Sequence, residues 1–340
     1  MTAPAAAAML AGLEARHRVH GGVTGWWDAP EGVDLAALTR AVEFVESCSF
    51  GDLAAIAVED AQRLAGPWSA RAPQATALAV RDAPQRVVLA EAIIERFGAL
   101  LDSSMDVDRQ QWWWCNGRGF GIEDARPVDG SHQTSRAWLT ATARGLWTVT
   151  DPPVEAHDGL VDAWELIFGP VSRWSMTVHR DARIVEIGSP ADWADLVVAF
   201  PLAHRQRPNS SWEIPGPNHQ PHPELLAIAG QRAQRSRMRW FVEPDWAAVA
   251  STCDAVHLSW GGFLTTEGTI IDLGSGDLTM MRNWCSERTL WLQSALEPGQ
   301  PLPPAELSGR INGVHGVDPA DDPERVELDR AWLDRVLTHG

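Results

Sequence analysis

An arginine between two glycines is the first residue whose setting could do chemistry. Arg118 stands between Gly117 and Gly119, just after the run QQWWWC. Glycine lets the backbone come close to a ligand, and a guanidinium can hold a phosphate or pyrophosphate through two hydrogen bonds at once. The turn is therefore a candidate phosphate-binding site, and the alternative is a surface turn with an incidental charge.

Two threonines and a glutamate follow later in the chain. Thr140 and Thr142, in RAWLTATARG, are two residues apart, so both hydroxyls would point to one face of a strand. Glu267, in FLTTEGTIIDL, comes just before another predicted strand. This order of arginine, hydroxyl-x-hydroxyl and glutamate resembles the arginine, serine-threonine-serine, glutamate pattern of toxin-type ADP-ribosyltransferases.

The resemblance implies that NAD is the substrate and that its nicotinamide–ribose bond is cleaved. By position, Arg118 would hold the NAD phosphates, and Thr140 and Thr142 would support the nicotinamide pocket. Glu267 would stabilise the oxocarbenium-like ribose as nicotinamide leaves. These four residues are the catalytic candidates.

The same comparison suggests which other residues contact the cofactor. Trp147 would take the place of the aromatic side chain that packs on nicotinamide, because the chain contains no tyrosine. We add Gly119, beside Arg118, and His257 to the residues expected to contact a dinucleotide or another phosphate-bearing small molecule.

His257 also belongs to a second arrangement, in TCDAVHLSWGG, with Asp254 before it and Ser259 after it. An Asp, His, Ser set supports nucleophilic catalysis only if the three groups hydrogen-bond in sequence, which neighbouring strand positions seldom allow. A histidine in an apolar strand is more often a core residue with satisfied hydrogen bonds.

Metal and disulfide chemistry are not expected. His204, His219 and His222 lie in a proline-rich stretch that predicts an irregular loop rather than a helix presenting imidazoles together. The four cysteines, Cys48, Cys115, Cys253 and Cys285, form no CxxC pair, so we expect reduced core residues in a cytoplasmic protein.

The composition excludes several enzyme classes. Among the 340 residues there is no lysine and no tyrosine, while tryptophan occurs 18 times. Without lysine there is no Walker A loop, Schiff base or kinase lysine. The formal charge of −17 disfavours nucleic acid and anionic membranes as partners. We expect most tryptophans to be structural, with Trp112, Trp113 and Trp114 packing on a strand.

The elements that would position these residues indicate an α+β fold. Apolar residues recur at helical spacing from Asp34 to Leu101, which predicts three helices, the first capped by Asp34. Residues 1–107 therefore form a helical N-terminal part. Residues 108–340 form an α+β domain with a mainly antiparallel sheet, and the two parts could pack as one unit. Within it, SPADWADLV and VEPDWAAVA each predict a helix start, and GTIIDL and LTMMRNW predict a hairpin.

Two functions follow from these residues. One is an NAD-dependent ADP-ribosyltransferase-like enzyme. The other is a non-catalytic binding or immunity-type protein, for which the partner would be a protein and the tryptophans would form a recognition surface.

Overall fold

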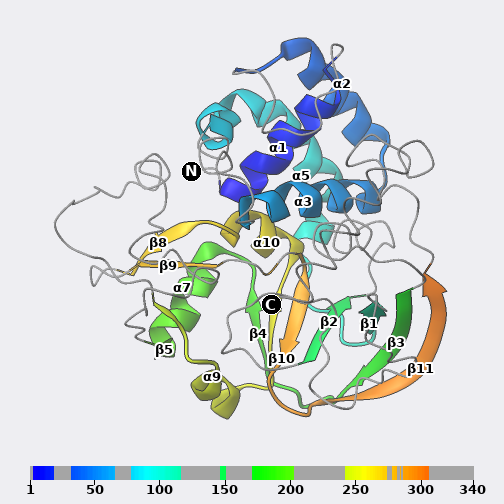
Figure 1. The fold of residues 1–340 in the computed structure, drawn as a ribbon, viewed down its shortest axis with the longest axis vertical. Coiled ribbons are helices and arrows are strands. Elements are labelled where there is room, and N and C mark those ends of the chain that lie inside the picture. Colours follow the sequence, from blue (N-terminus) through cyan, green and yellow to red (C-terminus); the bar gives the residue numbers. More distant parts are fainter. Residues whose placement is uncertain are drawn as a thin grey trace, which may run out of the picture.

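A sheet with helices gathered at one end and along one side forms the molecule (Figure 1). The computed structural model describes residues 3–18, 32–65, 78–115, 146–150, 171–202, 242–273, 278–281, 284 and 286–305. Within them the N-terminal helices come first and the sheet is mixed but mostly antiparallel. The predicted α+β class is confirmed.

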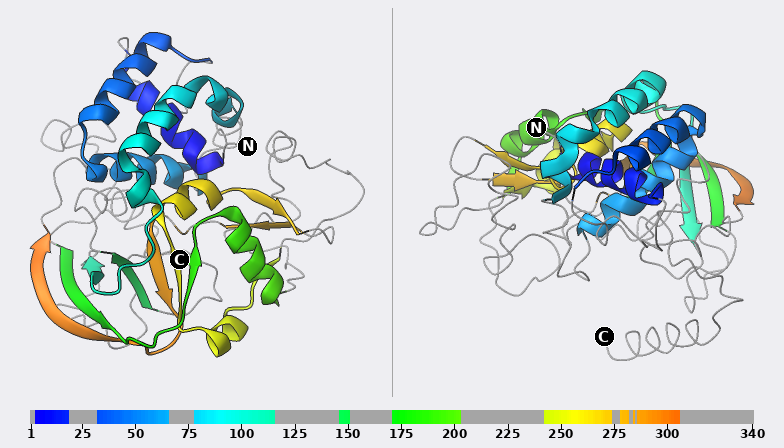
Figure 2. Two further views of the ribbon diagram at one scale, coloured as in Figure 1. Left: turned by 180° about the vertical axis from the view of Figure 1, so that it is seen from behind. Right: turned by 90° about the horizontal axis from the view of Figure 1, so that it is seen from above.

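The N-terminal helices pack on one another above the sheet (Figure 2). They are α1 (Pro4–Arg16), α2 (Leu35–Ser47), α3 (Phe50–Ala65), the 3-10 turn η2 (Ala83–Arg86) and α5 (Val87–Leu101). Asp34 caps α2 as predicted, since its carboxylate accepts hydrogen bonds from the amides of Ala36 and Ala37. α1 was not predicted, because a helix buried on nearly every side shows no apolar periodicity.

Seven strands form the main sheet, in the order β11-β3-β1-β2-β10-β7-β4. Their bounds are β1 (Gln110–Cys115), β2 (Leu146–Thr150), β3 (Val171–Val178), β4 (Ile184–Ile187), β7 (Ala255–Leu258), β10 (Arg288–Trp291) and β11 (Leu296–Ala305). β4 and β7 are parallel, and the other pairs are antiparallel. The two parallel strands lie together at one edge.

Short helices and hairpins complete the described fold. They are α7 (Pro190–Ala199), α9 (Trp246–Thr252), α10 (Trp260–Thr266), β5 (Pro201–Leu202) with β6 (Glu243–Pro244), and β8 (Ile270–Asp272) with β9 (Leu278–Met280). The predicted hairpin is thus confirmed as β8 and β9. The two Asp-Trp-Ala segments do begin helices, although Asp245 itself caps α9 whereas Ser189 caps α7.

One hydrophobic core joins the helices to one face of the sheet. It contains residues from α1, α2, α3 and α5 together with α7, α9, α10, β7 and β10. At its centre Trp284 packs on Trp147, Trp193 and Trp246, with ring centroids 5.2 to 6.4 Å apart within this group. These tryptophans are buried core residues, so they do not form a recognition surface.

A smaller cluster covers the opposite face of the sheet. Met105, Trp112 and Trp291 are buried there with five further apolar residues. Among the described residues, no helix combines the length and apolar character needed to cross a membrane.

Candidate functional site

A row of polar side chains crosses the sheet on the face that carries the smaller cluster. Glu186 in β4 is the register partner of His257 in β7, and His257 is the partner of Thr289 in β10. Thr289 is in turn the partner of Thr148 in β2. Because partner residues on adjacent strands share a face, these four side chains lie side by side.

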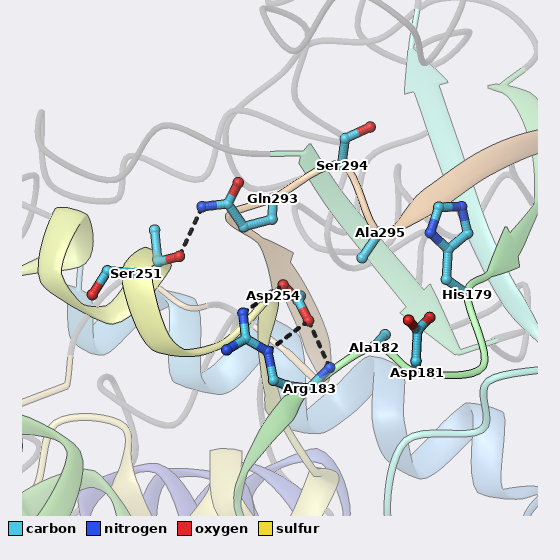
Figure 3. A pocket seen from close by; sticks show the side chains of 10 residues that line it. His179, Asp181, Ala182, Arg183, Ser251, Asp254, Gln293, Ser294 and Ala295 are labelled. Carbon is cyan, nitrogen blue, oxygen red and sulfur yellow. Dashed lines mark hydrogen bonds and ion pairs between the residues drawn. The ribbon is translucent and has the colours of Figure 1, made fainter.

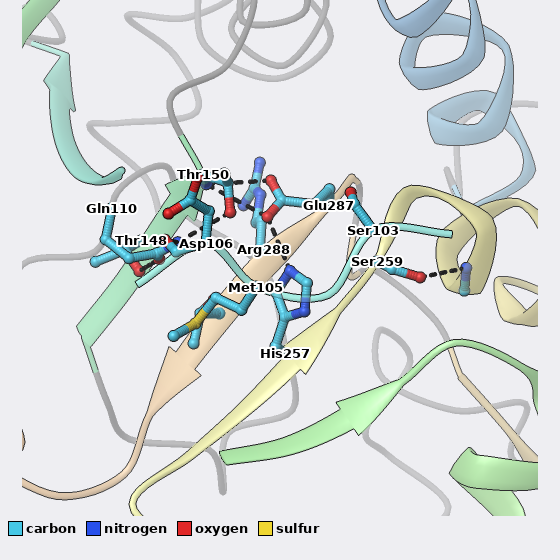
Figure 4. A network of polar contacts seen from close by, with 12 residues as sticks. Ser103, Met105, Asp106, Gln110, Thr148, Thr150, His257, Ser259, Glu287 and Arg288 are labelled. Atoms are coloured by element: carbon cyan, nitrogen blue, oxygen red, sulfur yellow. Dashed lines mark hydrogen bonds and ion pairs between the residues drawn. The ribbon is translucent and has the colours of Figure 1, made fainter. Parts of the chain in front are cut away.

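His257 is held between two carboxylates. Its Nδ1 lies 2.5 Å from Oε2 of Glu186, and its Nε2 lies 2.9 Å from Oε1 of Glu287 (Figure 4 shows the second contact). A ring that meets a carboxylate on both nitrogens donates from both, so His257 is an imidazolium cation. We call Glu186, His257 and Glu287 the carboxylate–histidine cluster.

Burial and charge act in opposite directions on His257. Burial lowers its pKa, because the apolar surroundings disfavour the cation. The hydrogen bonds and negative charges of Glu186 and Glu287 outweigh burial and raise the pKa of His257 to about 9. His257 is therefore protonated at neutral pH.

Solvent reaches only one member of the cluster to any extent. The side chain of Glu186 is 40% exposed, against 5% for Glu287 and 1% for His257. Glu186 is consequently the group through which the cluster could exchange a proton with a bound molecule.

The cluster lies where the two parallel strands end. β4 leads to Ser189, which caps α7, and β7 leads to Ser259, which caps α10. In open sheets with parallel strands, ligands bind outside the carboxyl ends of the strands. Glu186 and His257 sit at this end of the sheet, and Glu287 comes just before β10, which runs in the opposite direction.

A chain of hydrogen bonds supports Glu287 from the centre of the sheet. Trp291 Nε1 donates to Thr148 Oγ1 at 2.8 Å, and the Thr148 hydroxyl donates to Gln110 Oε1 at 2.5 Å. Gln110 Nε2 donates to Thr150 Oγ1 at 2.9 Å, and the Thr150 amide donates to both oxygens of Glu287 at 3.3 Å. An indole N–H can only donate, so the direction of the chain is fixed.

Two of the residues expected to act on or contact NAD, Glu267 and Trp147, both contact Trp284. Glu267 directly follows α10, is 3% exposed, and accepts a hydrogen bond of 3.3 Å from the Trp284 amide. The Trp284 ring packs edge-on against Trp147. Glu267 does come just before a strand, β8, as predicted, but the helix α10 in front of it is not predicted by the sequence.

The structure does not bring Trp147 and His257 together. Trp147 is the register partner of Leu290, and Leu290 is the partner of Val256, so Trp147 lies on the helix-covered face. His257 lies on the other face. The remaining predicted residues, Arg118, Gly119, Thr140 and Thr142, are outside the described residues.

The Asp254, His257, Ser259 set is not a hydrogen-bonded triad. Asp254 pairs with Arg183, with Oδ1 and Nη2 3.1 Å apart, and Ser259 Oγ accepts from the Gly262 amide. The hydrogen bonds from Arg183 lower the pKa of the Asp254 carboxyl. This ion pair lines a polar surface pocket at the other end of β4 and β7 (Figure 3).

Local spacing could not have revealed the two glutamates of the cluster. Glu186 and Glu287 are 71 and 30 residues from His257 in sequence. The sequence shows one glutamate inside the apolar strand IVEI, and an exposed glutamate in a strand is ordinary, so this residue does not mark the site.

No family model matches the chain, and neither a curated protein nor a solved structure matches it. The described residues contain no group of three or more histidine, cysteine, aspartate or glutamate side chains placed to hold a metal ion.

Proposed function

We propose that the chain is an enzyme that transfers a proton at the carboxylate–histidine cluster. The observation that supports this is a buried imidazolium with a carboxylate on each side, one buried and one reaching solvent. Strongly perturbed titrating groups of this kind concentrate at functional sites.

Each member has a distinct role. Glu186 exchanges a proton with the substrate, because it is the most exposed of the three. His257, already protonated on both ring nitrogens, accepts no further proton and donates a hydrogen bond to the Glu186 carboxylate through the 2.5 Å contact at Nδ1. Glu287 fixes the ring through Nε2 and balances its charge, as the carboxylate behind a catalytic histidine does.

The test is a turnover assay with NAD and other phosphate-bearing small molecules. Glu186→Gln removes the proton acceptor but keeps the shape, and we expect turnover to fall by roughly 10²- to 10⁴-fold, the usual contribution of general acid–base catalysis. The matched control is Glu297→Gln, because Glu297 is an exposed carboxylate on β11. Absence of turnover in the unmodified protein, or equal turnover in Glu186→Gln, would contradict the proposal.

A second candidate is ADP-ribosyl transfer from NAD, with Glu267 as the catalytic carboxylate. What favours it is that Glu267 and Trp147, two residues expected from the family pattern, both contact Trp284. NAD binding should then change tryptophan fluorescence, and Arg118→Ala should weaken that binding.

Glu267→Gln distinguishes this candidate from a binding protein without catalysis. If Glu267 stabilises charge only in the transition state, the variant keeps NAD affinity within a few-fold and releases nicotinamide roughly a hundredfold more slowly. NAD binding with no nicotinamide release by the unmodified protein would favour the binding protein instead.

A further inference from the structure

The segment that joins α5 to β1 is fastened to the carboxylate–histidine cluster. This segment, residues 102–109, has no regular secondary structure and is exposed apart from Met105, which is buried, and Asp106, which is half-buried. Met105 therefore anchors an otherwise solvated stretch.

Three contacts hold the segment against the sheet. The Met105 amide donates to Oε1 of Glu186 at 3.1 Å, and the Thr289 hydroxyl donates to the Met105 sulfur at 3.2 Å. Gln110 Nε2 also donates to the Asp106 carbonyl at 3.1 Å. Each contact goes to the polar row or to its supporting chain, and Figure 4 shows Met105 beside His257.

We infer that residues 102–109 are a cover over the carboxylate–histidine cluster, held closed by Glu186 and opening to admit a molecule to the Glu186 carboxylate. The inference rests on the proposed function for the role of the groups beneath the cover. Its structural basis is that one carboxylate serves both tasks, with Oε1 on the cover and Oε2 on the histidine.

Because Glu186 contacts both the cover and His257, proton transfer at Glu186 is coupled to opening of the cover. An ionised carboxylate is a stronger acceptor than a neutral carboxyl group. When Glu186 takes up a proton, its hold on the Met105 amide therefore weakens and the cover loosens. The charged residues of the cover itself are Asp102, Asp106, Asp108 and Arg109, and Glu287 is the other charged group on His257.

Hydrogen exchange in the intact protein tests the cover without any substrate. In Glu186→Ala we expect amide exchange within residues 102–109 to become roughly tenfold faster or more, as for the loss of a charge-assisted hydrogen bond in a locally opening segment. Exchange in β7 and β10 should stay within about twofold, because local opening leaves the sheet paired.

Two further variants sharpen the test. Glu186→Gln keeps an oxygen for the Met105 amide, so its effect should be smaller than that of alanine. Thr289→Val removes only the contact to the Met105 sulfur and should also speed exchange in the cover. Asp108→Asn is the control. It removes a charge from the same segment, and Asp108 makes none of the three contacts that hold the segment against the sheet.

Either of two results would overturn the cover. One is unchanged exchange in residues 102–109 of Glu186→Ala, and the other is an equal rise in β7 and β10, which would make the segment part of the cooperative core. Because exchange is measured without turnover, a cover that opens in a protein with no activity would refute the proposed enzyme and leave the cover standing.

Discussion

A histidine that donates from both ring nitrogens is a fixed positive charge, and His257 gains that state from its partners. Its burial alone would favour the neutral ring, so the proton stays only because Glu186 and Glu287 face it. The cluster as a whole carries one negative charge when both carboxylates are ionised. Loss of either glutamate would therefore lower the pKa of the histidine.

The titration of His257 is the most direct check at this scale. Its imidazole ¹⁵N signals should show a doubly protonated ring at pH 7 and a midpoint of about 9. The folded pKa lies above the ordinary value of 6.5, so the stabilisation is complete below pH 6.5 and is lost as the pH rises through 9. A midpoint near 6.5 would contradict the arrangement. In Glu186→Gln the midpoint should fall, because one of the two negative charges is gone.

Glu14, in the helical part, is a second buried charged group that depends on oppositely charged neighbours. It is fully buried in α1 and accepts hydrogen bonds from Arg18, from Arg86 and from the Asp34 amide. Glu14→Gln keeps the volume but leaves the buried Arg86 without a charged partner. Denaturant unfolding should show a loss of about 3–5 kcal/mol. Glu91→Gln, on the exposed face of α5, is the control and should change stability by less than about 0.5 kcal/mol.

At the scale of elements, close approach of backbones explains why α10 contains two glycines. A Cβ on Gly262 would lie 2.0 Å from the Ile187 carbonyl oxygen, and one on Gly261 would lie 3.0 Å from that of Leu101. α10 can therefore pack against the end of β4 and the end of α5 only without side chains there. This packing sets the position of Ser259 and the end of β7, and so that of His257.

Paired glycine-to-alanine substitutions test this account. Gly262→Ala should destabilise the protein by about 1–3 kcal/mol or more, since the methyl group overlaps backbone that cannot move freely. Gly98→Ala in α5 is the matched control, because its Cβ would meet Ile94 at an ordinary 3.7 Å. That substitution should stabilise by up to about 1 kcal/mol through helix propensity. Equal effects at the two positions would refute the close-approach argument.

The elements also show what the sequence could and could not predict. Local signals sufficed for the Asp34 cap, for α7 and α9, and for the hairpin of β8 and β9, because each depends on residues adjacent in the chain. α10 is not predicted by the sequence, because glycine is a poor helix former and the stability of this helix comes from packing. The carboxylate–histidine cluster is not predicted either. The order of the strands brings Glu186 and Glu287 to His257, and local sequence spacing does not encode that order.

For the whole molecule, the continuous core from α1 to β10 has a thermodynamic consequence. Helices of the N-terminal part and elements of the sheet contribute to the same buried cluster. If that core is the main source of stability, neither part can unfold while the other remains intact, and the protein should unfold in one transition. The division at residue 107 would then mark a change of structure within one cooperative unit.

Two native thiols report on this cooperativity from opposite parts of the core. Cys48 directly follows α2 and Cys253 directly follows α9. Both are free and buried, and burial raises the pKa of each thiol. In a variant with Cys115 and Cys285 replaced by serine, labelling with a thiol reagent should proceed at the same opening free energy for Cys48 and Cys253, because one global unfolding event exposes both. Glu14→Gln, in the helical part, should then speed the labelling of Cys253 as much as that of Cys48. Faster labelling of Cys48 alone would show that the helices unfold independently, and the shared core would not be cooperative.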